Sequence, residues 1–206
     1  LSIITPLAIN IVADGTPIRI ELFPADANNN PIYEDNIIVP AADVVNANIV
    51  GVEGKTVIDT FSGTGAVGQT FGLIEGPVIF DSIRVDVDGV RWTEVDYFTD
   101  SNPRREYIFE YDSDFNGFII FGNNRAGMIP SAASEIKVTY RVGGGTVGNI
   151  IAGFVEYQTN FPVPGLNHSI PATFRNFSNG KYGFSGDTIE DIRRKLPPYL
   201  RTQNRA

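Results

Sequence analysis

Hydrophobic and polar residues alternate in short runs along most of this chain, and this alternation is the two-residue period of β-strands. One such run, "IKVTYRV" at residues 136–142, places four apolar side chains on one face and three polar side chains on the other. We therefore expect a strand with one buried face here, and we predict Tyr140 to be an anchor of the hydrophobic core.

A second alternating run, "IRVDVDGVRW" at residues 83–92, predicts a β-hairpin. Asp88-Gly89 is a two-residue turn signal, and the register that it sets places Val90 and Trp92 on the same face as the valines of the first strand. Trp92 is therefore the second predicted core anchor. The alternation changes phase just after Trp92, which predicts a bulge.

Shorter runs of β-branched and aromatic residues indicate the remaining strands. We expect them at residues 7–12, 18–23, 44–52, 57–61, 69–74, 107–111, 118–121 and around 154–157. Asp14-Gly15 and Glu53-Gly54 each predict a hairpin between the strands that flank them. The chain is therefore expected to be mainly β, built from two or three small antiparallel β modules with sandwich-like packing.

Only the end of the sequence has helical periodicity. Asp187 and Glu190 have the spacing of a capping box, and Ile189, Ile192 and Leu196 form one apolar stripe. The two prolines that follow would end the helix. We therefore predict one C-terminal helix.

Breaks in the pattern suggest three regions. They are an N-terminal β module (1–75), a central β module (76–147), and a third segment (148–206) that returns in extended form and ends in the helix. We expect the chain to continue beyond this segment into a further C-terminal region.

A glycine-rich corner follows the strand at 136–142. Its residues are Gly143, Gly144, Gly145, Gly148 and Asn149. Glycine is favoured where the backbone needs a positive φ or passes close to another segment, so we interpret the corner as structural. The spacing also matches G-x-G-x-x-G, but a dinucleotide site needs a helix opening at the third glycine. The following residues, "NIIAGFVEYQTNFPVPG", lack that periodicity.

Composition narrows the function further. The formal charge is −8, there is no cysteine and there is one histidine. An acidic chain argues against nucleic-acid binding, and no apolar run reaches the ~20 residues of a membrane span. We expect neither an enzyme nor a cofactor, metal or small-molecule site.

Three groups of residues could form a metal or catalytic site, but each also has a simpler structural interpretation. Asp112, Asp114, Asn116 and Gly117 match the start of a calcium loop, but the twelfth position lacks the expected Glu, and we interpret these residues as a tight turn. Asp86 and Asp88 form a carboxylate pair that we interpret as a solvated face. His168 and Ser169 are adjacent, so in a strand their side chains would point to opposite faces and could not form a nucleophile–base pair.

A basic cluster lies near the end of the chain. It consists of Arg193, Arg194, Lys195, Arg201 and Arg205. The cluster is interpreted either as a solvated helix face or as a contact surface for an acidic partner, such as the acidic first third of a neighbouring copy.

Several phrases together resemble one protein family. "FIIFGNNRAGMIPS" (118–131) followed by "IKVTYRVGGGTVGNI" (136–150) resembles a segment of the J-type baseplate assembly proteins of phages. "IRVDVDGVRWTEV" (83–95) resembles the hairpin that precedes it, and "GDTIEDIRRKLPPYLRTQNRA" (186–206) resembles a downstream helix. The details are most similar to the baseplate wedge subunits of T-even-type contractile-tailed phages, although that family often has Asp where Asn123 stands here.

The resemblance implies a structural role without catalysis. Such proteins belong to the wedges around the hub of a contractile tail, associate in pairs and contact neighbouring wedge proteins. It implies location in the virion, at the tail baseplate, after assembly in the cytoplasm of the host bacterium. The alternative is a carbohydrate- or cell-surface-binding β module of a tail fibre, which would need exposed aromatic residues such as Trp92, Tyr97 or Tyr107.

Overall fold

The structure of the 206-residue chain is a computed structural model. It describes residues 2–3, 5–13, 15–38, 49–79, 81–99, 103–112, 116–143, 145–162, 167–181 and 183. This part of the chain is mainly β, as predicted, and contains several small antiparallel sheets and no α-helix. The predicted C-terminal helix lies outside the described residues.

The chain divides into two compact units, residues 1–143 and 144–206. The boundary that we expected at residue 75 falls inside unit 1. The boundary that we expected at residue 147 lies four residues beyond the division between the units.

Unit 1 begins with a three-stranded antiparallel sheet of order β2-β3-β5. Its strands are β2 (Leu7–Ala13), β3 (Thr16–Pro24) and β5 (Ile49–Glu53). The predicted hairpin at Gly15 is confirmed, with Ile11 opposite Ile18. A separate two-stranded pair joins β1 (Ser2–Ile3) to β4 (Ile37–Ile38).

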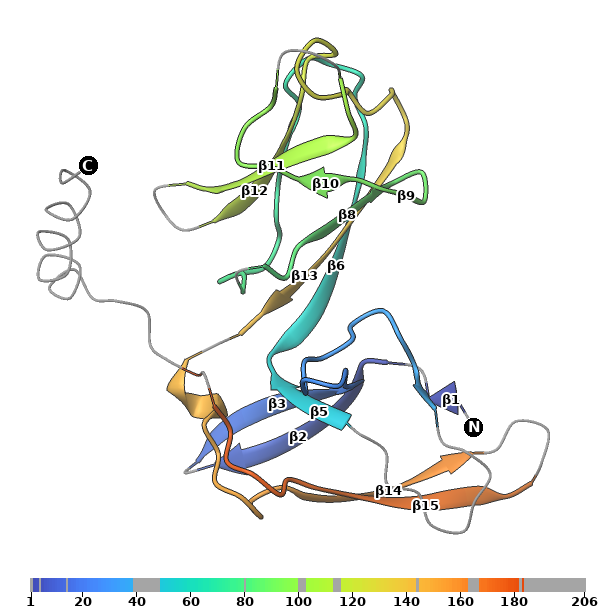
Figure 1. Ribbon diagram of the computed structural model, residues 1–206, viewed down its shortest axis with the longest axis vertical. Coiled ribbons are helices and arrows are strands. Elements are labelled where there is room, and N and C mark those ends of the chain that lie inside the picture. Colours follow the sequence, from blue (N-terminus) through green and yellow to red (C-terminus); the bar gives the residue numbers. More distant parts are fainter. Residues whose placement is uncertain are drawn as a thin grey trace, which may run out of the picture. The chain divides into compact units, whose positions relative to one another are not determined.

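Two four-stranded sheets form the rest of unit 1 (Figure 1). The first, in the order β6-β13-β8-β9, contains β6 (Lys55–Ser62), β13 (Glu135–Val142), β8 (Arg84–Val87) and β9 (Val90–Arg91). The second, in the order β10-β11-β12-β7, contains β10 (Thr93–Glu94), β11 (Glu106–Tyr111), β12 (Gly117–Phe121) and β7 (Thr70–Gly72). All these strands pair antiparallel except β10 and β11.

One hydrophobic cluster draws side chains from both four-stranded sheets. It contains Val57, Val78, Val85, Val87, Trp92, Tyr107, Ile119, Phe121, Ile136, Val138 and Tyr140. Trp92 is 5% exposed and packs edge-on against Phe121, with ring centroids 5.2 Å apart. Burying a residue of this size stabilises the fold by several times as much as a typical surface contact.

The hairpin around residues 88–89 has the predicted register, with Val87 opposite Val90, but its continuation differs. Val90 is exposed and does not join the buried face. The strand also has no simple bulge after Trp92. The N–H of Trp92 still donates to Val85 in β8 (2.9 Å), whereas the N–H of Thr93 donates to the carbonyl of Arg105 (2.9 Å). The strand therefore leaves one sheet and joins the other, and this exchange explains the change of phase.

The hairpin predicted through Gly54 is wrong. β5 pairs with β3, and β6 pairs with β13 over eight residues. Gly54 has φ 112° and marks the point where the chain passes from the N-terminal sheet into the long β6–β13 pair. A local turn signal cannot distinguish a hairpin from such a crossing, because both need a positive φ.

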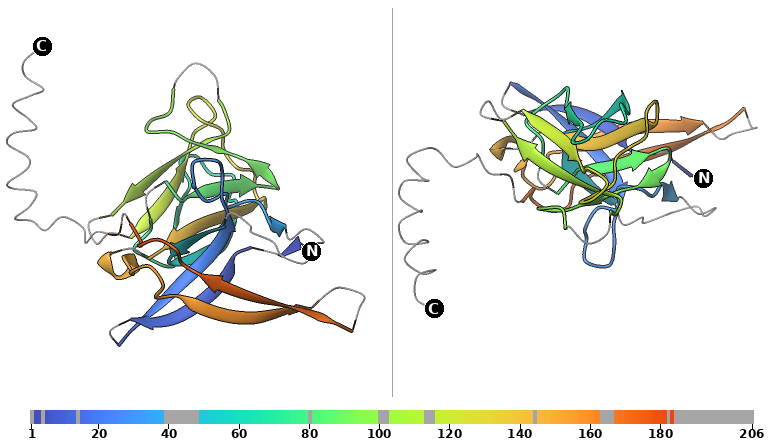
Figure 2. Two further views of the ribbon diagram at one scale, coloured as in Figure 1. Left: turned by 60° about the horizontal axis from the view of Figure 1, so that its bottom comes forward. Right: turned by 90° about the horizontal axis from the view of Figure 1, so that it is seen from above.

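Unit 2 contains a short 3-10 helix, η1 (Thr146–Gly148), and an antiparallel ribbon of β14 (Glu156–Pro162) and β15 (Ser169–Arg175), shown in orange in Figures 1 and 2. The sequence led us to expect a single short strand near 154–157 and a proline-extended segment. That expectation was wrong. Proline is tolerated on an edge strand, and each strand of a two-stranded ribbon has an unpaired edge, so Pro171 is accommodated in β15 opposite Asn160.

Candidate functional site

The glycine corner includes a close approach between two backbones. Gly143 has φ 141°, and a Cβ on it would lie 2.7 Å from the Cα of Gly54. A Cβ on Gly54 would in turn lie 2.6 Å from the carbonyl oxygen of Val142. The end of β13 and the start of β6 therefore touch through glycine, and any side chain would force them apart.

The other corner residues belong to unit 2, and among them Gly144 is outside the described residues. Gly145 has φ 102°, and Gly148 ends η1, which is three residues long. Asn149 holds Gly183, whose N–H donates to its side-chain oxygen at 3.0 Å. No α-helix begins at Gly148, so this G-x-G-x-x-G lacks the helix N-terminus that binds a dinucleotide.

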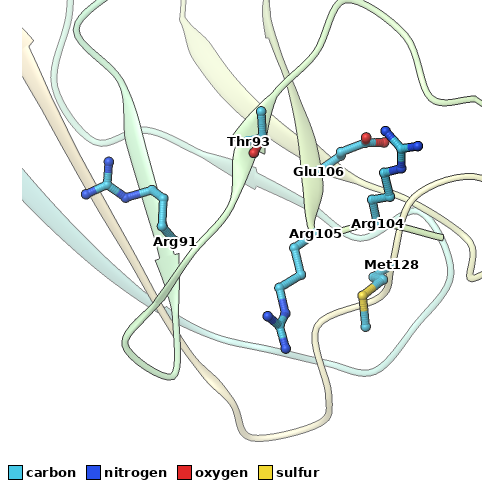
Figure 3. A pocket seen from close by; sticks show the side chains of 6 residues that line it. All are labelled: Arg91, Thr93, Arg104, Arg105, Glu106 and Met128. Atoms are coloured by element: carbon cyan, nitrogen blue, oxygen red, sulfur yellow. The ribbon is translucent and has the colours of Figure 1, made fainter.

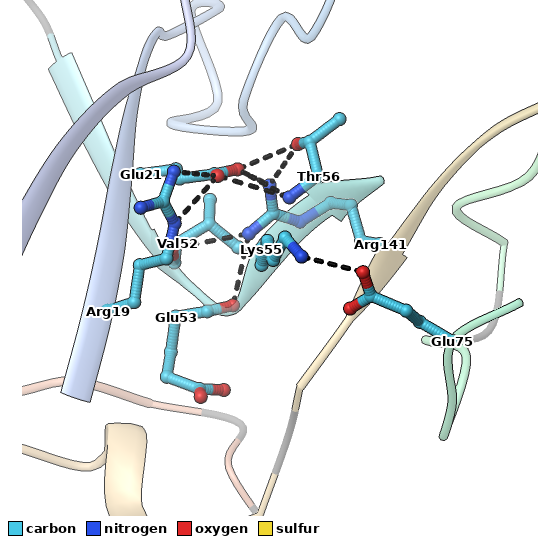
Figure 4. A network of polar contacts seen from close by, with 8 residues as sticks. All are labelled: Arg19, Glu21, Val52, Glu53, Lys55, Thr56, Glu75 and Arg141. Atoms are coloured by element: carbon cyan, nitrogen blue, oxygen red, sulfur yellow. Dashed lines mark hydrogen bonds and ion pairs between the residues drawn. The ribbon is translucent and has the colours of Figure 1, made fainter. Parts of the chain in front are cut away.

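Next to this corner, a buried ion pair joins the N-terminal sheet to the β6–β13 pair (Figure 4). Arg141 of β13 is 3% exposed and Glu21 of β3 is fully buried, and their charged groups lie 2.6 Å apart. Thr56 of β6 connects them, because its hydroxyl donates to Glu21 (2.7 Å) and accepts from Arg141 (3.0 Å). We call this group of three residues the arginine joint.

Aromatic rings and backbone carbonyls complete the surroundings of Arg141. Its guanidinium lies 5.2 Å from the ring centroid of Phe23 and 5.6 Å from that of Tyr33. It also donates to the carbonyls of Val52 (3.3 Å) and Glu53 (3.1 Å). Among the described side chains, only its Nε is a buried polar atom without a partner. The charge is thus almost completely compensated, as the burial of a guanidinium requires.

The joint also determines the charge of Glu21. Burial alone would raise the pKa of this carboxyl, but the hydrogen bonds from Thr56 and Arg141 outweigh it and the pKa is lowered. Arg19, which is part exposed, adds a further ion pair at 3.0 Å. Glu21 is therefore ionised at neutral pH inside the fold.

A second buried contact holds a loop against the same strand pair. The hydroxyl of Tyr140 donates to Asp59 of β6 (2.8 Å) and accepts from the N–H of Glu75 (3.0 Å). The same Asp59 oxygen accepts from the N–H of Ile74 (2.9 Å). Burial, reinforced by the Asp59 carboxylate, raises the pKa of Tyr140 to about 12, so the hydroxyl stays protonated and can keep donating.

The arginine joint was missed from the sequence, where Arg141 was assigned to the polar face of its strand. Lys137 on that face is exposed, but the N-terminal sheet covers the end of β13 and buries Arg141. One signal was present, since Glu21 interrupts the apolar residues of "IELF" at 20–23. An acid inside such a run needs a cationic partner, although the run does not identify which one.

The described members of the constellations considered for chemistry bind neighbouring protein groups or lie exposed. The Asp112 carboxylate accepts from the backbone and side-chain nitrogens of Asn116 (2.8 and 2.9 Å), and Asp114 lies outside the described residues. Asp86 pairs with Arg84 and Arg91, and His168 is exposed. No group of three or more His, Asp or Glu side chains in the described ranges is placed to hold a metal ion.

The surface of unit 1 carries an open depression of ≈ 480 Å³ (Figure 3). It is lined by Arg91, Thr93, Arg104, Arg105, Glu106 and Met128. Arg91 ends β9, just after the hairpin turn, and Arg104 and Arg105 immediately precede β11. We call this feature the basic depression. No sequence pattern pointed to any of its residues.

The cations that we predicted as a partner contact (Arg193, Arg194, Lys195, Arg201 and Arg205) lie outside the described residues. No helix in the described part of the chain is long and apolar enough to span a membrane. No protein-family model matches the sequence, and no curated protein is significantly similar to it.

Proposed function

We propose that this protein is a structural subunit of the baseplate of a contractile phage tail, where it links neighbouring wedge proteins around the hub. The proposal starts from the sequence resemblance to the J-type baseplate assembly proteins. In this chain the resembling residues form β12, the loop after it, β13 and the glycine corner. Its location would be the virion, and its partners other wedge proteins and a second copy of itself.

The observation that carries the proposal is the arginine joint. Unit 1 uses its most deeply buried charges, Glu21 and Arg141, to fix two sheets to each other. Breaking such a pair leaves an uncompensated buried charge, so the sheets are not free to separate at low cost. A rigid connection between sheets suits a protein that transmits force between neighbours and has no need of a reactive cleft.

The alternative, a carbohydrate-binding module, has less support. It needs exposed aromatic residues, but Trp92 and Tyr107 are both buried in the core cluster. Tyr97, at 72% exposed, is the one of the three that a ligand could reach. Tyr33, Tyr111, Phe154 and Phe177 are exposed as well, but the basic depression is lined by no aromatic residue on which a sugar ring could stack.

The proposal is tested on the virus that encodes the chain. Antibodies raised against the protein should label the tail tip of purified virions in electron micrographs. Disruption of its gene should give heads without complete baseplates, and a plasmid copy should restore them. Unlabelled tails together with normal particles from the disrupted gene would refute the function.

A further inference from the structure

The basic depression contains positive charge that the protein itself does not neutralise. The full chain has a net charge of −8, and six of the basic residues in the described ranges form ion pairs within it. Arg104 and Arg105 are exposed, and neither forms an ion pair with a described residue. Two adjacent unpaired cations on an acidic protein indicate a binding surface rather than a general attraction for anions.

The backbone fixes these two arginines in place. The carbonyl of Arg104 accepts hydrogen bonds from Met128 (2.8 Å) and Glu106 (2.9 Å), and the carbonyl of Arg105 accepts one from Thr93 (2.9 Å). Arg91 is held across the depression by Asp86 (2.9 Å) and Glu34 (3.0 Å). A partner would therefore meet a backbone that is ordered before binding, so that mainly the exposed arginine side chains lose freedom on association.

The geometry favours an extended anion over a compact one. In Figure 3 the guanidinium groups of Arg91, Arg104 and Arg105 lie around the depression and do not converge on one point. A single phosphate would need several donors aimed at the same oxygens. An extended chain with separated negative groups can meet Arg104 and Arg105 one after the other.

The sheet edge beside the depression favours a polypeptide. β9 is the last strand of its sheet among the described strands. The N–H of Trp92 points to β8, so by alternation the N–H of Arg91 points away from β8. This edge is two residues long, and a peptide backbone can hydrogen-bond to the outward N–H of Arg91 in the manner of strand pairing, which a polysaccharide cannot do.

We propose that the basic depression binds an extended, acidic polypeptide segment of a neighbouring protein. Acidic residues of this segment, separated by uncharged ones, would face Arg104 and Arg105, whereas Arg91 is already paired with Asp86 and Glu34. Glu106 also lines the depression, so the residues of the segment between the acidic ones should be uncharged. The inference rests on the proposed function only for placing the segment on another baseplate protein.

The test is a fluorescence anisotropy titration of the full chain at low ionic strength. The probe is a short labelled peptide in which glutamate alternates with threonine. We expect binding that is weakened at least about tenfold by Arg104→Glu with Arg105→Glu, since both attractions become repulsions. A peptide with lysine in place of glutamate should not bind.

A matched control separates the depression from overall charge. Arg125 and Lys137 are the other exposed cations of unit 1 that form no ion pair with a described residue, and they do not line the depression. Arg125→Glu with Lys137→Glu changes the net charge equally and should alter peptide binding by less than about twofold. Thermal unfolding should show that both double variants are folded.

Several results would overturn the inference. They are the absence of peptide binding, equal weakening by the control variant, or tighter binding of a heparin oligosaccharide or of inorganic phosphate at the same residues. If the chain alone forms dimers and the Arg104→Glu, Arg105→Glu variant does not, the partner of the depression is a second copy of the chain, and the inference of a neighbouring protein is wrong. If the peptide does not bind but antibodies label the baseplate, only this inference is refuted. If the peptide binds but the tails stay unlabelled, only the proposed function is refuted.

Discussion

Arginine has opposite roles in the two polar regions of unit 1. In the arginine joint, Arg141 is buried and contacts a carboxylate, a hydroxyl, two carbonyls and two aromatic rings. In the basic depression, Arg104 and Arg105 are exposed and form no ion pair with the described residues. The difference is the degree of compensation. A buried guanidinium needs nearly all its partners within the fold, whereas an exposed one is hydrated and remains available to another molecule.

The comparison separates residues that maintain the fold from residues that contact partners. Substitutions in the joint should change stability, and substitutions in the depression should change binding. The protein's single tryptophan, Trp92, lies in the core of unit 1, so its fluorescence reports the unfolding of that unit.

The largest expected effect is that of Arg141→Met. The substitution keeps much of the side-chain volume but leaves Glu21 buried without its cation, and we expect a loss of about 3–5 kcal/mol in the free energy of unfolding. Urea titration followed by tryptophan fluorescence measures it. Arg19→Met removes only the part-exposed partner of Glu21 and should cost less than about 1 kcal/mol.

The double variant Glu21→Gln, Arg141→Met sharpens this prediction. With both charges removed, a large part of the stability should return, since the main cost of the single change is the unpaired carboxylate. If Arg141→Met costs no more than Arg19→Met, the joint does not hold the two sheets together.

Next in size is Gly143→Ala at the corner. A Cβ there would lie 2.7 Å from the Cα of Gly54, and the alanine would also have to adopt the positive φ of this position. Gly89→Ala is the matched control, because Gly89 has φ 74° but nothing lies within 4 Å of its Cβ position. We expect Gly143→Ala to cost about 1–3 kcal/mol more than Gly89→Ala, by the same urea titration. Equal costs would mean that the close approach at the corner contributes nothing.

The pH dependence of stability tests the charge of Glu21. Its pKa in the folded state is lowered from the ordinary value of 4.5, so its contribution is fully present above that value and is lost as the pH falls through the lower, folded pKa. Stability should therefore fall more steeply below pH 4.5 in the natural protein than in Glu21→Gln. Urea titrations across that range, at constant ionic strength, measure the difference. Parallel curves would show that Glu21 is not held ionised.

The smallest expected effect on stability is that of Arg104→Ala with Arg105→Ala. Both side chains are exposed and unpaired, so the free energy of unfolding should change by less than about 0.5 kcal/mol. A loss comparable to that of Arg141→Met would assign the depression to the fold and erase the distinction between the two regions.

The sequence predicted the local β structure well. Alternation located β2, β3, β11, β12 and β13, and the Asp88-Gly89 turn fixed the register of β8 and β9. It failed where a strand changes partner. Gly54 has a turn signal but marks a crossing, and the phase change after Trp92 marks an exchange between sheets. Partner choice depends on residues far away in the chain, which periodicity does not report.

The candidate site was predicted less well. The glycine corner was visible because three consecutive glycines require a backbone reason. The arginine joint was not, because Glu21 and Arg141 are 120 positions apart. The basic depression was also missed, since its arginines lie on separate segments that no local pattern connects.

The sequence alone determined that this is a mainly β chain with its apolar faces set by alternation, because the side-chain period of a strand is a local property. Only the tertiary structure decided which polar residues are buried. A polar face becomes interior when another sheet covers it, as happens to Arg141 but not to Lys137 on the same strand. The fold therefore makes one cation of that strand part of the architecture and leaves the other exposed to solvent.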